Sequence, residues 1–364
     1  MTNLLYVPVD VDGATALMFV DTGDPFLLLS PITYPRAPEP VGSVSTVGVE
    51  SDHVSNVQVL TSSTAVPTSP DPAVTIGGLL GCTVICGSVI SFDYRDAVFT
   101  IGDPVAPSGL MPETVLPFSF KGGETVQSCG STVTVPRSRV VVTVEIEGAA
   151  HTMIVDTGAS ALTVDANIYA ELTQDGRAQL TGGMVMTTSG STSASFTRAK
   201  SVSVGGVEAQ DIVVSHDPSF DMNLADVSTD AGVTIEGSLG GTFLNEFYVT
   251  IDYPNEKLHF ARYADTSFIV DPADNLGFYP EATGDGGYTV ARVFPGTDAA
   301  NKGVSVGDTL LAIDGIALAS QTLSQTVVLL SGKVGSTKSV EFGAAAKLGN
   351  MTVPITVANL LPLP

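Results

Sequence analysis

The sequence predicts a mainly β protein made of two similar lobes, followed by a small α+β domain. The triplet Asp-Thr-Gly occurs twice, at residues 21–23 and 156–158, and each copy ends an apolar run typical of a strand. Glycine (37 residues) and proline (22) are frequent beside many Val and Thr, a mix that favours short strands joined by tight turns. A different pattern begins near residue 275, where short strands alternate with two helical segments.

The composition excludes several classes of function. A chain of 364 residues exceeds one ordinary domain, so we expect two or three. The 38 acidic and 15 basic residues give a formal charge of −23, which repels phosphate backbones, and we expect no nucleic-acid partner. No apolar run reaches the roughly 18 residues of a membrane span. The four histidines are scattered, so we expect no metal and no cofactor, and we expect a monomer.

The cysteines and the start of the chain bear on its compartment. Three cysteines leave at least one thiol outside an internal bridge, and one bridge from Cys129 to Cys82 or Cys86 would fit an oxidising compartment. No signal peptide precedes the first strand, which fits a cytosolic chain or an exported one (periplasmic, cell-surface or secreted) whose targeting segment is absent. The Thr/Ser/Gly-rich, Lys-poor composition without Trp favours export.

The first half, residues 1–105, is predicted to be a lobe of strands. Residues 4–20 alternate apolar and polar side chains around Asp12-Gly13, a hairpin signal, and the second strand of this hairpin ends at Asp21. Further strand segments are predicted within residues 31–75, 76–81, 89–94 and 97–101. A Pro/Gly-rich linker at residues 106–114 separates this lobe from the next.

The second half, residues 115–264, repeats this order. A strand at 139–147 and a strand at 151–155 form the hairpin that ends at Asp156. The other predicted elements are a helix at 165–172 with Asp165 as its N-cap, a hairpin at 183–204, and strands at 235–240, 247–253 and 257–260.

An alignment of the halves supports an internal duplication. Setting Gly81 against Gly240 also superposes Asp93-Tyr94 on Asp252-Tyr253 without a gap, at an offset of 159 (240 − 81). The two Asp-Thr-Gly triplets have a smaller offset of 135 (156 − 21). The second half therefore carries 24 additional residues, which we place in the helix and hairpin of residues 165–200.

Two carboxylates a few ångströms apart can hydrolyse an amide without a metal or a covalent intermediate. Like charges so close do not both ionise easily, so the pair shares one proton and titrates as a unit. The ionised group takes a proton from water while the other protonates the substrate carbonyl. We expect Asp21 and Asp156 to meet in this way across a pseudo-twofold axis, with glycines allowing tight turns and threonines locking the loops. These supporting residues are Thr22, Gly23, Thr157 and Gly158.

Residues 1–263 resemble the bilobal pepsin/retropepsin-like aspartic proteases. The resemblance rests on the two triplets and on an apolar-apolar-Gly element after each, at Leu79–Gly81 and Ser238–Gly240. Asp-Thr-Gly-Ala-Ser and Val249–Pro254 are most similar to the bacterial branch. The resemblance implies a two-lobed aspartic-protease double-ψ β-barrel fold with pseudo-twofold symmetry. It also implies that Asp21 and Asp156 are catalytic and that the substrate is an extended polypeptide.

The first half-site departs from the family pattern. The family has Ser, Thr or Ala after the first Gly, whereas Asp24-Pro25 follows here. Asp24 would add a negative charge beside the pair and raise its pKa values, or would mark a degraded half-site. The resemblance also implies flap hairpins near residues 42–50 and 184–196, and neither segment contains a Tyr.

Residues 275–364, after a linker at 265–274, resemble a small α+β PDZ domain of bacterial proteases. The matching segments are Asn275–Phe278, Val293–Ala300 and Val306–Gly315. In that family, amides of the Leu-Gly-Phe loop hold a peptide's terminal carboxylate, and the peptide adds a strand to the sheet edge. The resemblance implies peptide binding by Leu276, Gly277 and Phe278. The alternative is a domain that packs on the protease lobes and binds no peptide.

The favoured function is an aspartic endopeptidase whose PDZ domain recruits or positions the substrate. A catalytically inactive peptide-binding or scaffold protein that keeps both folds is the alternative, and cleavage of its own chain only is a third possibility.

Overall fold

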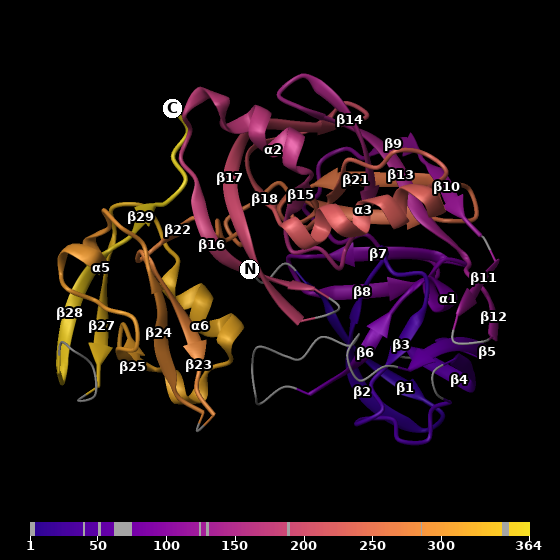
Figure 1. Ribbon diagram of the computed structural model, residues 1–364, viewed down its shortest axis with the longest axis horizontal. Helices are drawn as coiled ribbons and strands as arrows, with labels where there is room; N and C mark the ends of the chain where they lie inside the picture. Colours follow the sequence, from indigo (N-terminus) through magenta and orange to yellow (C-terminus); the bar gives the residue numbers. More distant parts are fainter. Residues whose placement is uncertain are drawn as a thin grey trace.

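The computed structural model describes residues 4–38, 41–49, 52–61, 75–123, 125–128, 131–187, 190–284, 286–343 and 349–364. The fold is mainly β, with two lobes and a C-terminal domain beside them (Figure 1). The first half, in indigo, lies below the second half, in magenta and coral, and the orange and yellow C-terminal domain lies to the left (Figure 1). The predicted domain boundaries remain predictions.

The first half forms a closed barrel in the strand order β1-β2-β6-β3-β5-β4. Its apolar strands bury Val9, Met18 and Leu79 completely. The elements of this half are β1 (Tyr6–Val11), β2 (Ala14–Val20), β3 (Leu27–Leu29), β4 (Val41–Val49), β5 (Asp52–Thr61), β6 (Ile76–Leu80), α1 (Cys82–Ile85), β7 (Val89–Asp93) and β8 (Val98–Ile101).

The second half forms an eight-stranded sheet in the order β10-β13-β14-β19-β15-β18-β17-β16, with β13 also pairing with β17. Its strands are β9 (Thr114–Pro117), β10 (Ser119–Gly122), β11 (Thr125–Ser128), β12 (Ser131–Thr134), β13 (Arg137–Ile146), β14 (Ala149–Val155), β15 (Leu162–Val164), β16 (Leu180–Thr187), β17 (Gly190–Val204), β18 (Val207–His216), β19 (Gly237–Leu239), β20 (Phe247–Asp252) and β21 (Lys257–Arg262). Its helices are α2 (Ala166–Leu172), η1 (Thr173–Asp175), α3 (Pro218–Ala231) and α4 (Gly241–Leu244).

Helix α2 is confirmed with its predicted cap, because the Asp165 carboxylate accepts a hydrogen bond from the Ile168 amide at 2.9 Å. Helix α3 was not among the predicted elements. Its signals are nevertheless in the sequence: Asp217 is its N-cap, Pro218 its first residue, and Gly232 ends it in the left-handed conformation. The helix packs on the second lobe through Leu224 and neighbouring apolar residues.

Each half places the strand before its Asp-Thr-Gly triplet beside the later apolar-apolar-Gly strand. Strand β2 pairs in parallel with β6, and β14 pairs in parallel with β19. The strand after each triplet, β3 or β15, lies antiparallel on the other side of β6 or β19. The predicted double-ψ arrangement is therefore present in both halves.

A five-stranded sheet, β8-β7-β20-β21-β9, joins the two halves. At its centre Ile90 pairs with Ile251, and Phe92 pairs with Val249. In the alignment that sets Gly81 against Gly240, Ile90 corresponds to Val249 and Phe92 to Ile251. The pairing therefore maps onto itself when the halves are exchanged, which places the pseudo-twofold axis between β7 and β20.

Strand registers locate the additional residues of the second half. Strands β1 and β13 are equivalent, since each opens the hairpin that leads to its Asp-Thr-Gly triplet. Strand β1 pairs with β4 through Val49, and β13 pairs with β17 through Val204, so β4 corresponds to β17. The stretch from Asp21 to Val49 (49 − 21 = 28) is shorter than the stretch from Asp156 to Val204 (204 − 156 = 48). Twenty of the 24 additional residues therefore precede Val204, in α2, β16 and β17, as predicted.

The first predicted flap is wrong. Residues 42–49 lie in β4, which the barrel holds between β1 and β5, and residue 50 lies outside the described residues. The physical reason is the missing length, since the described part of the first half contains no strand equivalent to β16. The second predicted flap, residues 184–196, lies in the paired strands β16 and β17, and residues 188–189 are outside the described residues.

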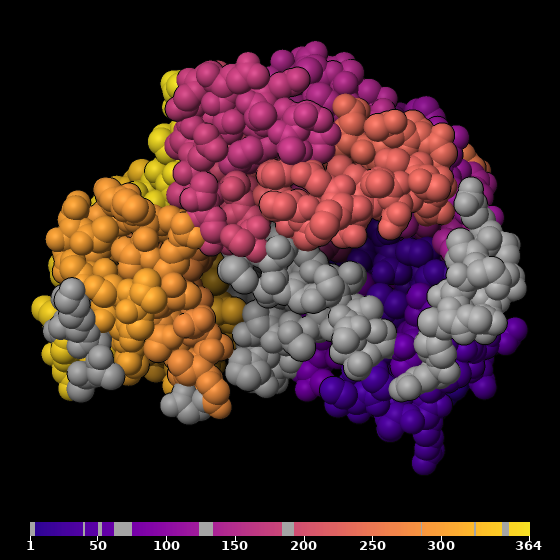
Figure 2. Space-filling model, in the orientation of Figure 1, coloured from indigo at the N-terminus to yellow at the C-terminus, as the bar shows by residue number. Residues whose placement is uncertain are grey.

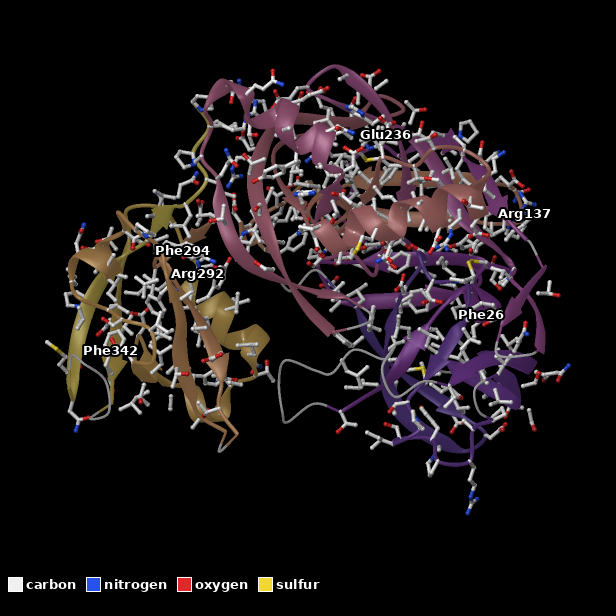
Figure 3. The ribbon with its side chains drawn as sticks, in the orientation of Figure 1. Phe26, Arg137, Glu236, Arg292, Phe294 and Phe342 are labelled. Atoms are coloured by element: carbon white, nitrogen blue, oxygen red, sulfur yellow. A yellow bond between two sulfur atoms is a disulfide. The ribbon has the colours of Figure 1, made fainter. Side chains whose placement is uncertain are left out.

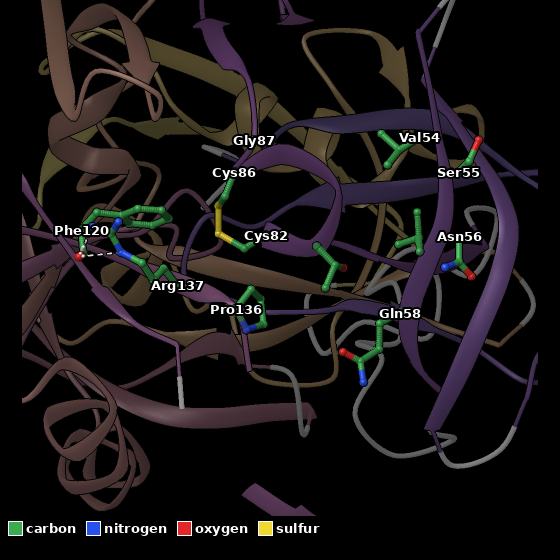
Figure 4. Close-up of a pocket in the computed structure, with 12 residues that line it drawn as sticks. Val54, Ser55, Asn56, Gln58, Cys82, Cys86, Gly87, Phe120, Pro136 and Arg137 are labelled. Atoms are coloured by element: carbon green, nitrogen blue, oxygen red, sulfur yellow. Dashed lines mark hydrogen bonds between the residues drawn. A yellow bond between two sulfur atoms is a disulfide. The ribbon is translucent and has the colours of Figure 1, made fainter. Parts of the chain in front are cut away.

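The disulfide joins Cys82 to Cys86 and corrects the expected bridge to Cys129. The two cysteines lie four residues apart at α1, where their Cα atoms are 4.7 Å apart, within the range that a disulfide spans. Cys129 lies outside the described residues. The bridge lines a cavity of about 490 Å³ between β5 and the segment of Pro136 and Arg137 (Figure 4).

The C-terminal domain has its own apolar core, which includes Leu276, Phe278 and Phe342. Its main sheet has the order β23-β24-β25-β27-β28, so β23 is an edge strand. The elements are β22 (Asp274–Asn275), β23 (Phe278–Ala282), β24 (Tyr288–Val293), α5 (Asp298–Asn301), β25 (Thr309–Ile313), β26 (Ile316–Ala317), η2 (Leu318–Ser320), α6 (Leu323–Leu330), β27 (Thr337–Phe342), β28 (Met351–Thr356) and β29 (Ala358–Asn359).

Both ends of this domain are attached to the β16–β18 region of the second lobe. The buried Arg198 of β17 donates to the Leu361 carbonyl at 3.0 Å and forms an ion pair of 2.7 Å with Asp271. Arg292 of β24 lies so close to Gly182 of β16 that a side chain on Gly182 would collide with its guanidinium. Figure 3 shows Arg292 beside Phe294 at this side of the domain.

Candidate active site

The two predicted aspartates face each other where the lobes meet. The Asp21 side chain lies against the backbone of Gly158, and the Asp156 side chain lies against that of Gly23. A Cβ atom on either glycine would collide with the carboxyl group of the opposite half. Neither glycine has a positive φ angle, so this position requires glycine for close approach and not for the turn that the sequence predicted.

Reciprocal hydrogen bonds lock together the two loops that carry Asp21 and Asp156. The Thr22 amide donates to Oγ1 of Thr157 at 3.1 Å, and the Thr157 amide donates to Oγ1 of Thr22 at 3.0 Å. Each hydroxyl then donates across the axis, Thr22 to the Val155 carbonyl at 3.1 Å and Thr157 to the Val20 carbonyl at 2.9 Å. Both threonines are buried, so the four bonds hold the aspartates in register without competition from water.

Replacing Thr157 with Val is expected to lower the free energy of unfolding by about 2–4 kcal/mol. The change leaves the Thr22 amide and the Val20 carbonyl without a partner in a buried site. Thr157→Ser is the matched control, because it keeps the hydroxyl and loses only a methyl group. Urea unfolding curves measure the difference, and a Val variant as stable as the Ser variant would show that the lock contributes little.

Backbone amides hold both carboxylates in equivalent ways. The Asp21 Oδ1 atom accepts from the amides of Gly23 at 2.8 Å and Asp24 at 3.1 Å. The Asp156 Oδ1 atom accepts from the Gly158 amide at 2.9 Å. The loops also rest on equivalent supports, since the Cys82 amide donates to the Asp24 carbonyl and the Gly241 amide to the Ala159 carbonyl.

The pKa values of both aspartates are raised, as the chemistry of a shared proton requires. Burial is the largest cause for Asp21, and the charges of Asp156 and then Asp24 add to it, so the Asp21 pKa lies well above its usual range. Burial also raises the pKa of Asp156. The Gly158 amide, a hydrogen bond from Asp21 and the charge of Arg139 limit this rise.

Charged side chains surround the first loop. Burial raises the pKa of Asp24 to about 6, although its carboxylate accepts a hydrogen bond from the Phe26 amide at 2.8 Å. Arg139 of β13 donates to the Gly23 carbonyl and forms an ion pair of 2.7 Å with Asp230 of α3. Asp24 is recognisable in the sequence by its place after the first triplet, whereas no local pattern distinguishes Arg139 and Asp230 from surface charges.

Two tyrosines with buried hydroxyl groups lie near the dyad. Burial raises the pKa of Tyr94 and of Tyr253, and the charge of Asp156 raises that of Tyr94 further, as the charge of Asp21 does for Tyr253. No described residue provides a hydrogen-bond partner for either hydroxyl. These tyrosines correspond under the duplication, so the repeated Asp-Tyr pair was the signal that could have placed them at the site.

A cavity of about 460 Å³ opens beside the loop that carries Asp21, between that loop and helix α3. Its lining includes Pro25, Val135, Arg139, Asp226 and Asp230. Figure 2 shows a recess on this face below the coral segment that contains α3. The described residues hold no cluster of three or more His, Cys, Asp or Glu side chains arranged to bind a metal ion. None of their helices has the length and apolar character needed to cross a membrane.

In the C-terminal domain, the predicted peptide-binding loop is already paired. The Leu276 amide donates to the Leu330 carbonyl of α6 at 3.1 Å, and the Gly277 amide donates to Oδ1 of Asn275 at 2.7 Å. Leu276 and Phe278 are completely buried. The edge strand β23 also contains Pro280, which has no N–H to offer an added strand. A peptide carboxylate would therefore have to replace bonds that the domain makes with itself.

Comparisons with known proteins agree with this geometry. Residues 142–224 match the family model described as gag-polyprotein putative aspartyl protease, and residues 269–342 match the PDZ domain model. The first match contains Asp156 but not Asp21. The search of curated proteins gave no match.

Two solved structures are similar to parts of the chain. An aspartic proteinase from Irpex lacteus is 14% identical over 72% of this chain and 95% of that one, with a TM-score of 0.45. A photosystem II D1 C-terminal processing protease is 24% identical over 25% of this chain and 24% of that one, with a TM-score of 0.23. Both scores are low, so the fold assignment rests on the strand topology and the family models.

Proposed function

We propose that this chain, which carries an aspartyl-protease-like domain and a PDZ domain, is an aspartic endopeptidase. The observation that carries the proposal is the pairing of Asp21 and Asp156, each against the glycine of the other loop and each with a raised pKa. Two such carboxyl groups share a proton and can work as base and acid together.

In the proposed reaction, a water molecule binds between the two carboxyl groups. The ionised aspartate takes a proton from this water as it attacks the peptide carbonyl, and the protonated aspartate donates its proton to the carbonyl oxygen. The resulting tetrahedral diol collapses as its C–N bond breaks. The aspartate that took the proton of water gives it to the leaving nitrogen, and the other aspartate takes back a proton from a diol hydroxyl. The substrate is an extended polypeptide, and the β16–β17 hairpin of the second half is the proposed flap over it.

An assay of cleavage tests the proposal. An unfolded, reduced protein that serves as substrate is incubated separately with the wild type and with Asp156→Asn, from acid to neutral pH. The fragments are identified by mass spectrometry. Cleavage by the wild type alone supports an endopeptidase. If neither the wild type nor Asp156→Asn cleaves the substrate, an inactive scaffold is favoured. A single cut in the protein's own chain, which is lost in Asp21→Asn, would indicate self-processing only.

For the PDZ domain, we propose that the loop Leu276–Phe278 receives the C-terminus of a substrate or partner peptide. Because two of its amides are already paired, this binding requires the loop to open from α6. A labelled peptide library with free C-termini should therefore bind the full chain more tightly than the same peptides with amidated C-termini. The expected difference is about tenfold or more, from the loss of charge-assisted hydrogen bonds. Equal affinity would favour a domain that only packs on the lobes.

We also propose that the chain works outside the cytosol, in the periplasm, at the cell surface or in the medium. The Cys82–Cys86 disulfide supports this compartment, because such bridges persist in oxidising surroundings.

A further inference from the structure

The two aspartates have equivalent backbone surroundings but unequal charged neighbours. Each carboxylate accepts amide hydrogen bonds from its own loop, and each lies against the opposite glycine. The position after the glycine differs, because it is Asp24 in the first half and Ala159 in the second. The dyad is therefore symmetric in shape and asymmetric in charge.

Asp24 places a third carboxyl group on the Asp21 side. Its amide donates to Asp21 Oδ1 at 3.1 Å, so its Cα atom is fixed next to the dyad. Its side chain turns back onto the Phe26 amide, at 2.8 Å, in a half-buried position. The protein around it reduces screening by water, and a negative charge at this place raises the pKa of Asp21.

Arg139 places a single positive charge on the same loop from the other lobe. It donates to the Gly23 carbonyl, and its partner Asp230 lies at 2.7 Å on helix α3. Both side chains are largely buried, with 12% and 16% exposed. When the two triplets are aligned, the first half has Leu4 at the position of Arg139, so this position supplies no equivalent cation to the second loop. The Arg139 charge lowers the pKa of both Asp24 and Asp156.

We propose that Asp24 and Arg139 are positioning residues that make the two half-sites chemically unequal: Asp24 keeps the shared proton on Asp21, and Arg139 keeps Asp156 ionised as the base that receives the proton of water. This inference rests on the proposed peptidase function and assigns separate roles to its two aspartates. The two proton transfers balance: the proton that leaves water goes to Asp156, and the proton on Asp21 goes to the substrate carbonyl.

The charged and titratable groups around the pair come from several elements. Asp24 belongs to the first loop, Arg139 to β13 and Asp230 to α3, and Tyr94 and Tyr253 follow β7 and β20. Burial raises the pKa of both tyrosines, so they stay neutral where the dyad works. Among the described residues, Asp24, Arg139 and Asp230 are therefore the groups whose charge can distinguish Asp21 from Asp156.

The pH dependence of kcat/KM separates the two roles, because its acidic limb follows ionisation of Asp156 and its alkaline limb follows loss of the proton from Asp21. The Asp24 pKa of about 6 means that its charge is present mainly on the alkaline side. Asp24→Asn, which keeps the acceptor for the Phe26 amide, should move the alkaline limb to lower pH and leave the acidic limb in place. Arg139→Gln should move the acidic limb to higher pH.

Three further variants act as controls. Arg139→Lys keeps the positive charge and should restore the acidic limb. Asp230→Asn leaves the Arg139 charge without its counter-ion and should move the acidic limb to lower pH. Glu171→Gln removes a carboxylate from an exposed position of helix α2, outside the cavity beside the first loop, and should leave both limbs where they are. Thermal unfolding of each variant, followed by circular dichroism, establishes that a shifted limb does not result from unfolding of the variant.

The outcomes distinguish this inference from the proposed function. If the wild type cleaves, Asp156→Asn does not, and the limbs of Asp24→Asn and Arg139→Gln coincide with those of the wild type, the peptidase stands and the inference is wrong. If either variant shifts both of its limbs in the same direction, the inference is also wrong. If the wild type and Asp156→Asn cleave equally little, the peptidase itself is wrong.

Discussion

Asp156→Asn is expected to lower kcat/KM for a peptide substrate about 10²–10⁴-fold, the range for loss of a positioned acid or base. The amide keeps the shape of the carboxylate and its acceptor for the Gly158 amide, but it cannot receive a proton from water. Asp21→Asn should be equally severe, because an amide cannot donate an acidic proton to the carbonyl. Since the two groups act as a unit, the double variant should be no worse than either single one.

The matched control is Asp165→Asn in the same lobe. Asp165 caps helix α2 through the Ile168 amide, and Asn caps helices as well as Asp does. Activity should stay at the wild-type level. Steady-state kinetics on a peptide chosen from the cleavage map measures all four variants. Retention of wild-type turnover by Asp156→Asn would remove the aspartate dyad from the mechanism.

The free energy of unfolding is expected to fall as pH rises from about 4 to about 8. Burial and the neighbouring charges raise the pKa of Asp21, Asp156 and Asp24 above their value in the unfolded chain. Between the unfolded and folded pKa values, the folded protein binds more protons than the unfolded one, so raising the pH favours unfolding. For Asp24, whose pKa rises to about 6, this contribution is up to about 3 kcal/mol.

Other carboxylates act in the opposite direction at lower pH. Hydrogen bonding to Arg177 lowers the pKa of Glu147, and this stabilisation is lost as pH falls through the folded value. The most stable range should therefore lie on the acidic side of neutrality. Urea unfolding at a series of pH values tests this, and Asp24→Asn should flatten the decline while the exposed Asp226→Asn should not. Stability that rises from acid to neutral pH would contradict the expectation.

Much of the fold was predictable because its signals are local or periodic. Each Asp-Thr-Gly triplet after an apolar strand fixes a turn, and the later apolar-apolar-Gly elements repeat at the same offset as the Asp-Tyr pairs that follow them. This repetition predicted the position of most of the additional residues, and the resemblance that rests on the same elements implied the paired strands β2–β6 and β14–β19. Asp165 predicted the start of α2, and the resemblance of the segments after residue 275 implied the PDZ domain.

Other features depended on contacts between distant segments. The flap assigned to residues 42–50 was wrong, because only the strand pairings show that β4 closes the barrel against β1 and β5. The predicted bridge to Cys129 was wrong. Cys82 and Cys86 come close enough for a disulfide only because the chain between them forms the helical turn α1. The peptide loop Leu276–Phe278 matched its family in sequence, yet its pairing with Leu330 of α6 is a tertiary contact.

The sequence alone determined that two similar half-sites exist and that Asp21 and Asp156 belong to them, because strand, turn and glycine are encoded within a few residues of each triplet. Only the tertiary structure decided what surrounds them. Thr22 and Thr157 bond to each other across the two lobes, and Arg139 reaches the first loop from the second lobe. The charge on a buried carboxyl group depends on all of its neighbours in space, and a linear pattern does not contain them.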